Sequence, residues 1–215
     1  MNARLISLTQ PVISEASTAE QLIVYCARVS NPSNQANVET GVKLLAYCIR
    51  NKHWSIFEQA SMTIEVKTSR AIAAQILRHR SFSFQEFSQR YAAATEHEPI
   101  EIRMQGESNR QGGEIITDNP HLLAEVETVV KQAFQTYDWM LSSGVAKESA
   151  RMVLPLCTTT TLYMTANVRS WIHYFQQRLD SHAQKEHREL AGLMWDIFQK
   201  NFPETSAAVS TLLAD

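Results

Sequence analysis

The 215-residue chain is poor in cysteine: it has Cys26, Cys48 and Cys157, an odd number with no two at the spacing of a metal motif. This scarcity argues against a disulfide scaffold and favours a reducing compartment. The chain also lacks any run of about 18 apolar residues, the length that could span a bilayer. Residues 1–9 carry one charge and no long apolar stretch, so we expect no signal peptide. These absences predict a cytoplasmic protein with no membrane partner.

The chain has little net charge, -2 at pH 7, which gives no electrostatic reason to bind nucleic acid. Thirteen of the 20 basic residues are Arg, whose planar fork matches phosphate and carboxylate oxygens in a way that Lys cannot. The basic residues therefore favour a site for anionic small molecules. Hydrophobic residues make up 44% of the chain, and its length suits one sizeable core, so we expect a single domain over residues 1–215.

Strand and helix patterns are mixed along the chain without regular alternation. Apolar and polar residues alternate over residues 62–67, which predicts a half-buried strand, and shorter extended segments are expected at 5–8 and 158–165. Helical spacing predicts helices at about 18–29, 38–51, 69–77, 120–141, 168–179 and 183–202. We expect a loop or distorted element at 81–90 and a surface loop at 104–118. The pattern predicts an α+β fold with a central, mostly antiparallel sheet flanked by long helices.

One segment concentrates the residue types that chemistry requires. Gln75, Arg78 and His79 share a helix face by their spacing, and Arg80, Glu86, Ser88 and Arg90 follow among three phenylalanines. Arginines can hold phosphates, and aromatic rings can shield a planar ligand from water. A charged helix end stabilised by the helix dipole would show a similar composition. A nucleic-acid patch is a further reading, which the net charge disfavours.

The fixed positions in this segment resemble a signature of the flavin-dependent thymidylate synthases. That signature has the form R-H-R-x-x-S-x-N-E-x-S-x-R, and this chain matches it at Arg78, His79, Arg80, Ser83, Glu86, Ser88 and Arg90. Gln85 stands where the family has Asn. Residues 53–58, 150–155, 167–170 and 178–184 resemble four further elements of the family, although Ile56 and Gln59 depart from the first. The resemblance thus extends over most of the chain.

The resemblance implies an enzyme that converts dUMP to dTMP. FAD would be the cofactor, with NADPH as reductant and methylenetetrahydrofolate as carbon donor. The residues that would hold FAD are Ser55, Arg78, His79, Arg80, Glu86, Asn167, Arg169 and His173. Those that would hold the nucleotide are Gln75, Arg78, Glu86, Phe87, Ser88, Gln89, Arg90, Arg151 and Arg178. Arg178 would also be the catalytic residue, facing the uracil ring and stabilising its anionic form.

Two observations on the residues agree with that implication. None of the three cysteines lies in a Pro-Cys-His context, so uracil would have to be polarised electrostatically, for which a fixed guanidinium is suited. On a helix over 168–179, Arg169 and His173 lie about 40° apart, whereas Arg178 lies about 180° from Arg169. A helix that uses both faces suits two pockets or two subunits, in agreement with the family's homotetramer and its shared active sites.

Two other hypotheses compete with the enzyme. The first is a nucleotide- or flavin-binding protein of the same fold without turnover, supported by Gln85, Ile56 and Gln59. The second is a phosphate-ester hydrolase, for which no metal set can be assembled. His182, Glu186 and His187 do not have the His-Glu-x-x-His spacing, so we predict no metal site.

Overall fold

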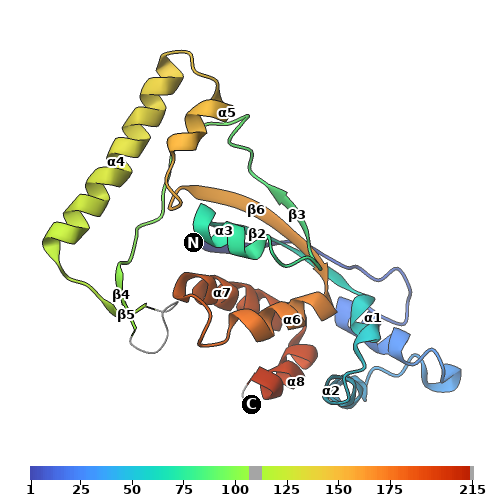
Figure 1. Cartoon of the computed structure of the whole chain (residues 1–215). Helices are drawn as coiled ribbons and strands as arrows, with labels where there is room; N and C mark the ends of the chain where they lie inside the picture. The colour runs from blue at the N-terminus through green and yellow to red at the C-terminus, as the bar shows by residue number, and fades with distance from the viewer. Residues whose placement is uncertain (107–112, 214–215) are drawn as a thin grey trace. The chain divides into compact units, whose positions relative to one another are not determined.

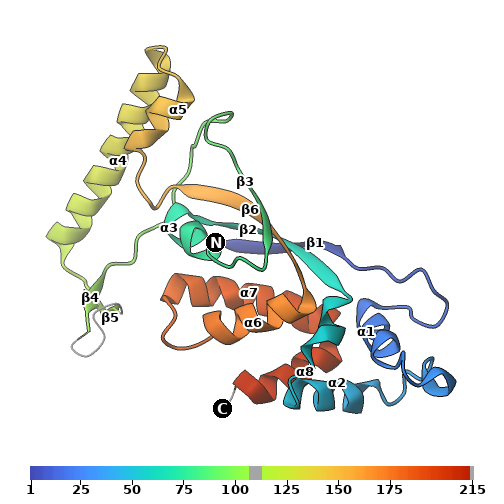
Figure 2. The same ribbon diagram turned by 45° about the vertical axis from the view of Figure 1, so that its right-hand side comes forward.

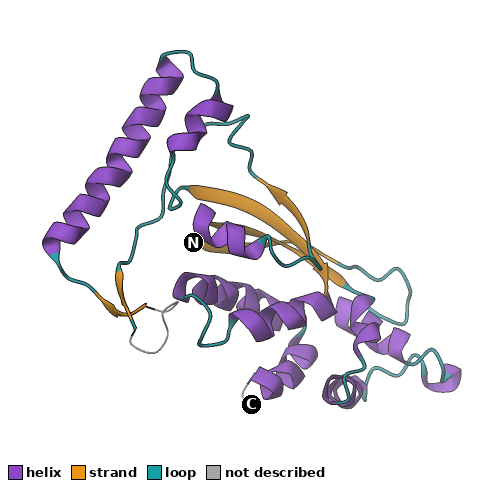
Figure 3. Ribbon diagram, in the orientation of Figure 1, coloured by secondary structure: helices purple, strands orange, loops and turns teal. Residues whose placement is uncertain are grey.

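The computed structural model describes residues 1–106 and 113–213 (Figure 1). The strands are β1 (Asn2–Leu8), β2 (Ser61–Ser69), β3 (Ser83–Glu86), β4 (Arg103–Gln105), β5 (Gly113–Ile116) and β6 (Thr159–Asn167). The α-helices are α1 (Ala19–Ala27), α2 (Gly41–Arg50), α3 (Arg70–Ile76), α4 (Pro120–Ser142), α5 (Lys147–Ala150), α6 (Val168–Arg178), α7 (Lys185–Asn201) and α8 (Pro203–Leu213). Three short 3-10 turns are η1 (Pro32–Asn34), η2 (Trp54–Glu58) and η3 (Arg151–Val153). Figure 3 shows how helices and strands intermix along the chain.

The main sheet has four strands in the order β1-β2-β6-β3. The N–H of Val168 donates to the carbonyl of Ala60 at 2.9 Å, and the hydroxyls of Thr63 and Thr165 lie 2.9 Å apart. Between these two contacts the position on the β2 side rises from 60 to 63 while the position on the β6 side falls from 168 to 165. Strands β2 and β6 therefore run antiparallel. The predicted α+β fold with an antiparallel sheet is confirmed.

The alternation predicted for residues 62–67 is also confirmed. Met62, Ile64 and Val66 of β2 are all fully buried, and so are Leu162 and Met164 of β6. Side chains of successive strand residues point to opposite faces, so these two strands bury one apolar face against the helices.

Contacts within the described residues group the chain into two compact units. The α4 unit comprises Met1, Lys67–Ile76 and Glu86–Thr161, and the α6 unit comprises Asn2–Val66, Leu77–Gln85 and Leu162–Asp215. Strands β2, β3 and β6 contribute residues to both units. The single domain expected from the sequence stays a prediction, and each unit is described below by itself.

Aromatic side chains form the core of the α6 unit. Trp171 and Phe175 of α6 stack with their ring centroids 5.7 Å apart, and the series continues through Phe198 to Phe202. The indole N–H of Trp171 donates to the carbonyl of Met62 at 3.1 Å, which ties α6 to β2. In Figure 2, α6 and α7 lie side by side below β1 and the start of β2. This packing fixes the orientation of α6, the helix that carries the predicted site residues Arg169, His173 and Arg178.

The long helix α4 dominates its own unit. It begins as the sequence predicted, with Pro120 in the first turn and the side chain of Asn119 accepting from the N–H groups of His121 and Leu122. Tyr137 is fully buried, and its hydroxyl accepts from the backbone N–H of Ala94 at 3.2 Å. That bond joins α4 to the segment that follows the signature run.

Three predictions about local structure were wrong. The surface loop expected at 104–118 contains strands β4 and β5, which pair antiparallel with Arg103 opposite Ile116, while residues 107–112 lie outside the described residues. A Cβ on Gly113 would lie 2.4 Å from the Cβ of Arg103, so glycine is required at that position. The segment 81–90, expected to be a loop or a distorted element, contains the short strand β3, and the helix α8 was missed altogether. Strands of three or four residues are too short to show a period, which is why the pattern missed them.

A buried carboxylate stabilises the start of α8 and gives a first prediction. Glu20 is 5% exposed, and its two oxygens accept from the backbone N–H groups of Glu204 and Thr205 at 3.2 and 2.6 Å. Glu20→Ala leaves both donors unpaired, so we expect the free energy of unfolding to fall by about 1–2 kcal/mol. Urea unfolding measures this loss. The Glu20→Gln variant should lose less free energy of unfolding, and the exposed control Glu15→Ala should lose almost none. Equal losses in all three variants would contradict the capping role of Glu20.

Candidate active site

The α6 unit contains a groove of about 530 Å³ at the start of α6. We call it the α6 groove; it is lined by Trp54, Glu58, Ser81, Asn167, Arg169, Ser170, Ile172, His173 and Gln176. Asn167, Arg169 and His173 were predicted from the sequence as flavin ligands. The prediction did not include Trp54, Ser81 or Gln176, although Trp54 and Ser81 adjoin predicted residues and Gln176 lies one turn after His173.

The junction of β6 and α6 positions these groups. Asn167 ends β6 and caps α6, its side-chain oxygen accepting from the N–H of Ser170 at 3.0 Å. The guanidinium of Arg169 forms an ion pair with Glu58 of η2, and the Nε2 of His173 lies 2.8 Å from the amide nitrogen of Gln177. The groove therefore combines a cation paired with the Glu58 carboxylate, an amide, an imidazole and the indole of Trp54.

The remaining predicted flavin residues lie outside the lining of the α6 groove. Ser55 is exposed on η2, beside Trp54, and Arg78 and Arg80 are also exposed. His79 is only 8% exposed. Glu86 belongs to the α4 unit.

Arg178 and His79 form the second feature of the α6 unit. The Nε of Arg178 donates to the Nε2 of His79 at 2.9 Å. Among the described residues, no carboxylate pairs with Arg178, so its terminal N–H groups keep their donor capacity. Arg178 is not in the lining of the α6 groove, in agreement with its predicted position on the other face of α6.

Burial and neighbouring cations keep the histidines of this cluster neutral. The pKa of His79 is lowered to about 4, first by desolvation and then by the charge of Arg178. The pKa of His187, which is fully buried, is lowered to about 3 by the same causes. Its Nε2 lies 3.0 Å from the hydroxyl of Tyr174, whose pKa burial raises. A neutral His79 can accept the hydrogen bond from Arg178 without repelling its positive charge. The cluster therefore holds a single charged group, the guanidinium of Arg178, in one position.

The α4 unit contains a second groove, of about 290 Å³, which we call the α4 groove. It is lined by Arg70, Gln89, Arg151, Met152, Leu154, Pro155, Leu156 and Thr158. Gln89 and Arg151 were predicted as nucleotide ligands, whereas Arg70 and Thr158 were not. No signal in the sequence singled out Arg70, which precedes the signature run by eight positions.

Two polar groups of the α4 groove are buried without a partner. Gln89 is 8% exposed and its amide nitrogen has no hydrogen-bond acceptor, and the hydroxyl of the fully buried Thr158 is likewise unpaired among the described residues. A buried donor without an acceptor costs about 1–3 kcal/mol. Both residues belong to the lining of the α4 groove.

The other predicted nucleotide residues of the α4 unit have varied environments. Glu86 is held by an ion pair with Arg70 and by the hydroxyl of Thr160 at 2.9 Å. Phe87 is 38% exposed and Ser88 is half-buried. The guanidinium of Arg90 lies 3.7 Å from Glu148. Gln75 lies half-buried on α3.

Over residues 1–106 and 113–213, no group of three or more His, Cys, Asp or Glu side chains is placed to hold a metal ion. The nearby pair of His182 and Asp180 is an exposed contact of 2.8 Å. In the described part of the chain, none of the helices has the length and apolar character that crossing a membrane requires.

The α6 unit thus has a groove that combines a cation, an amide and an imidazole, and the α4 unit has a groove lined by two arginines. Residues 11–204 match the family model described as thymidylate synthase complementing protein. The chain belongs to this family of flavin-dependent thymidylate synthases, as the sequence predicted.

Individual relatives agree with that assignment. The probable flavin-dependent thymidylate synthase of Paramecium bursaria Chlorella virus 1 is 51% identical over 213 residues, which cover 97% of this chain and 99% of the relative. The flavin-dependent thymidylate synthase of Synechocystis is 51% identical over 215 residues, with the same coverage. A crystal structure of the UMP/dUMP methylase PolB from Streptomyces cacaoi, bound with 5-Br dUMP, has a TM-score of 0.82 and 29% identity, and covers 98% of this chain and 94% of that chain. The predicted enzyme class, a methyltransferase that depends on a flavin, is confirmed.

Proposed function

We propose that the chain converts dUMP to dTMP by reductive methylation, with methylenetetrahydrofolate as carbon donor and NADPH as reductant of FAD. The products are dTMP, tetrahydrofolate and NADP⁺. The observation that carries the proposal is Arg178, a cation without a carboxylate partner in the described residues that donates only its Nε to His79. Full-length similarity to flavin-dependent thymidylate synthases supports the same reaction.

The donor set of the α6 groove fits FAD. Arg169, Asn167 and Ser81 can hold the diphosphate, and Trp54 offers an apolar wall to a ring. A volume of about 530 Å³ lies in the range of cofactor sites. When bound, FAD supplies the hydride that reduces the transferred carbon to a methyl group. The residues of the chain bind it and exclude water.

The nucleotide is proposed to bind through Gln89 and Arg151 of the α4 groove. The buried amide of Gln89 gains the acceptor that it lacks among the described residues, and Arg151 supplies positive charge for the phosphate. Glu86, held by Arg70 and Thr160, is fixed as an acceptor for a substrate N–H or hydroxyl. Gln75, Arg78, Phe87, Ser88, Arg90 and Arg178 complete the proposed nucleotide set.

Arg178 is proposed to activate the uracil ring. The ring must become electron-rich at the carbon that accepts the one-carbon unit, and a guanidinium beside the developing oxyanion stabilises that charge. A cysteine nucleophile is a poor alternative, because burial raises the pKa of Cys26, Cys48 and Cys157. Electrostatic activation therefore replaces covalent activation.

Further parts of the proposal concern the setting of the enzyme. We expect a homotetramer with active sites shared between subunits, because α6 carries functional residues on opposite faces. Light scattering of the purified protein tests the tetramer. The three free thiols suit a reducing cytoplasm, and the 215 residues are proposed to act as a single domain.

One experiment separates this enzyme from a flavin-binding protein without turnover. The purified protein should be yellow, its flavin absorbance should bleach with NADPH, and dTMP should form when dUMP and methylenetetrahydrofolate are added. Bleaching without dTMP formation would favour the alternative, a flavin-binding protein without turnover. The departures from the family pattern at Gln85, Ile56 and Gln59 are the sequence features that support this alternative. A colourless protein that takes up no added FAD would contradict the proposal.

A substitution in the α6 groove gives a second prediction. Arg169→Gln removes the groove's arginine and breaks the ion pair with Glu58. We expect the affinity for FAD to fall about tenfold or more, since a charge-assisted hydrogen bond contributes about 1.5–3 kcal/mol. Titration of the apoprotein with FAD, followed by flavin fluorescence, measures the change. Arg50→Gln, on the end of α2, is the control; equal losses would show that the α6 groove does not hold FAD.

A further inference from the structure

Arg70, which holds Glu86 by an ion pair, also lines the α4 groove beside Gln89 and Arg151. It is the first residue of α3. Its backbone N–H donates to the carbonyl of Thr158 at 2.9 Å, and the next N–H, of Ala71, donates to Leu156 at 3.0 Å. Because Thr158 and Leu156 also line the groove, these two bonds fix Arg70 against its wall.

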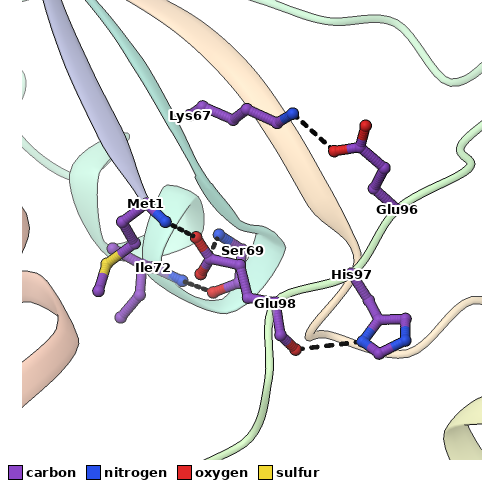
Figure 4. A network of polar contacts seen from close by, with 7 residues as sticks. All are labelled: Met1, Lys67, Ser69, Ile72, Glu96, His97 and Glu98. Carbon is purple, nitrogen blue, oxygen red and sulfur yellow. Dashed lines mark hydrogen bonds and ion pairs between the residues drawn. The ribbon is translucent and has the colours of Figure 1, made fainter.

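A polar network holds the start of α3 in this place. The carboxylate of Glu98 accepts from the backbone N–H of Ser69 at 2.9 Å, and Figure 4 shows the two groups directed at each other. Glu98 is itself anchored, since its N–H donates to the carbonyl of Cys157 at 2.9 Å. The backbone of Arg70 is therefore held by neighbours on both sides.

The guanidinium of Arg70 keeps donors for a ligand. Its Nη1 pairs with Glu86, whose position Thr160 also fixes, and among the described residues no second carboxylate pairs with it. The Arg70 side chain is 38% exposed, against 18% for Glu86. A guanidinium group has five N–H donors, so the ion pair with Glu86 orients the group and leaves other N–H donors for a ligand.

The α4 groove presents donors and no carboxylate among its lining residues. Arg70 and Arg151 contribute charge, and the buried amide of Gln89 and hydroxyl of Thr158 lack partners in the part of the chain described. Two guanidinium groups in one groove match the oxygens of a phosphate group. The small volume, about 290 Å³, suits a mononucleotide better than a dinucleotide.

We infer that Arg70 is a substrate-binding residue that contacts the phosphate group of a nucleoside monophosphate in the α4 groove. The inference rests on the proposed function, because it takes dUMP as the ligand. It places beside Arg151 a second guanidinium of the α4 groove, oriented by Glu86, that favours the nucleotide over the nucleoside.

The test compares binding of dUMP and of deoxyuridine, which lacks the phosphate. Arg70→Gln should lower the affinity for dUMP about 10- to 100-fold and leave the affinity for deoxyuridine unchanged. The ratio of the two affinities therefore falls by the same factor. Calorimetric titration of the FAD-loaded protein measures both ligands. Arg4→Gln, which breaks the comparable ion pair with Glu65, is the matched control and should leave the ratio unchanged.

The outcomes separate this inference from the proposed function. If the unaltered protein binds no dUMP, the proposed substrate is wrong. If it binds dUMP and Arg70→Gln weakens both ligands equally, Arg70 only supports Glu86 and the inference is overturned. Should Arg70→Gln fail to fold by circular dichroism, Arg70→Lys keeps the charge without the fork, and an unchanged ratio in that variant overturns the inference.

Discussion

Replacing Arg178 by Lys is expected to lower the rate of dTMP formation about 10²- to 10³-fold while FAD content stays unchanged. Lysine keeps the positive charge but loses both the Nε donor to His79 and the planar fork. Removing one donor that stabilises a developing oxyanion costs a factor of this size in rate. Because Arg178 lies outside the lining of the α6 groove, cofactor retention should not depend on it.

The measurement combines initial rates of dTMP formation with the flavin absorbance of the purified variants. Arg188→Lys is a matched control in the same unit, since the guanidinium of Arg188 donates to the backbone carbonyls of Ser181 and Ala183. Its rate should stay within about twofold of the unaltered enzyme. A parallel fall of rate and FAD content in Arg178→Lys would show that the residue is structural.

The second large effect is a loss of stability on acidification. His79 and His187 have folded-state pKa values lowered to about 4 and about 3, against 6.5 for an unperturbed histidine. Between those values the unfolded chain binds more protons than the folded chain, so folding becomes less favourable as pH falls. The contribution of each histidine is complete above about pH 6.5. It is lost as the pH falls through 4 for His79 and 3 for His187, and each loss is on the order of a few kcal/mol.

Urea unfolding at pH 7.5, 5.5 and 4.5 measures the loss. His187→Gln can keep the hydrogen bond to Tyr174 but has no proton to bind, so its stability should depend less steeply on pH by about one proton. His121→Gln, an exposed histidine of α4, is the control and should leave the slope unchanged. Equal slopes in all three proteins would show that buried histidines do not account for the acid sensitivity.

Features encoded locally were predictable from the sequence. The alternation of β2 and the start of α4 near Pro120 each depend on residues a few positions apart. Strands β4 and β5 have three and four residues, and their paired residues lie 8 to 13 positions apart. Such pairing leaves no period in the sequence, so the segment was wrongly predicted to be a loop.

The same distinction applies to the site. Asn167 and Arg169 were predicted from a matched element and His173 from the family resemblance, and all three line one groove. The contact between Arg178 and His79 joins residues 99 positions apart, and that between Arg70 and Glu86 joins residues 16 apart. Neither contact has a local signal, and the depressed pKa of His79 depends on the burial that folding creates. Motifs predicted which residues matter; their protonation and partners required the fold.

The cap at Asn167 has a chemical consequence for the α6 groove. Its side-chain oxygen accepts from the N–H of Ser170, and its amide nitrogen carries two further N–H donors. A ligand oxygen that accepts from these donors suits this point of the groove. An aspartate here would cap the helix equally well but would present a negative oxygen to a phosphate. Asparagine is thus the residue that serves the helix and an anionic ligand together.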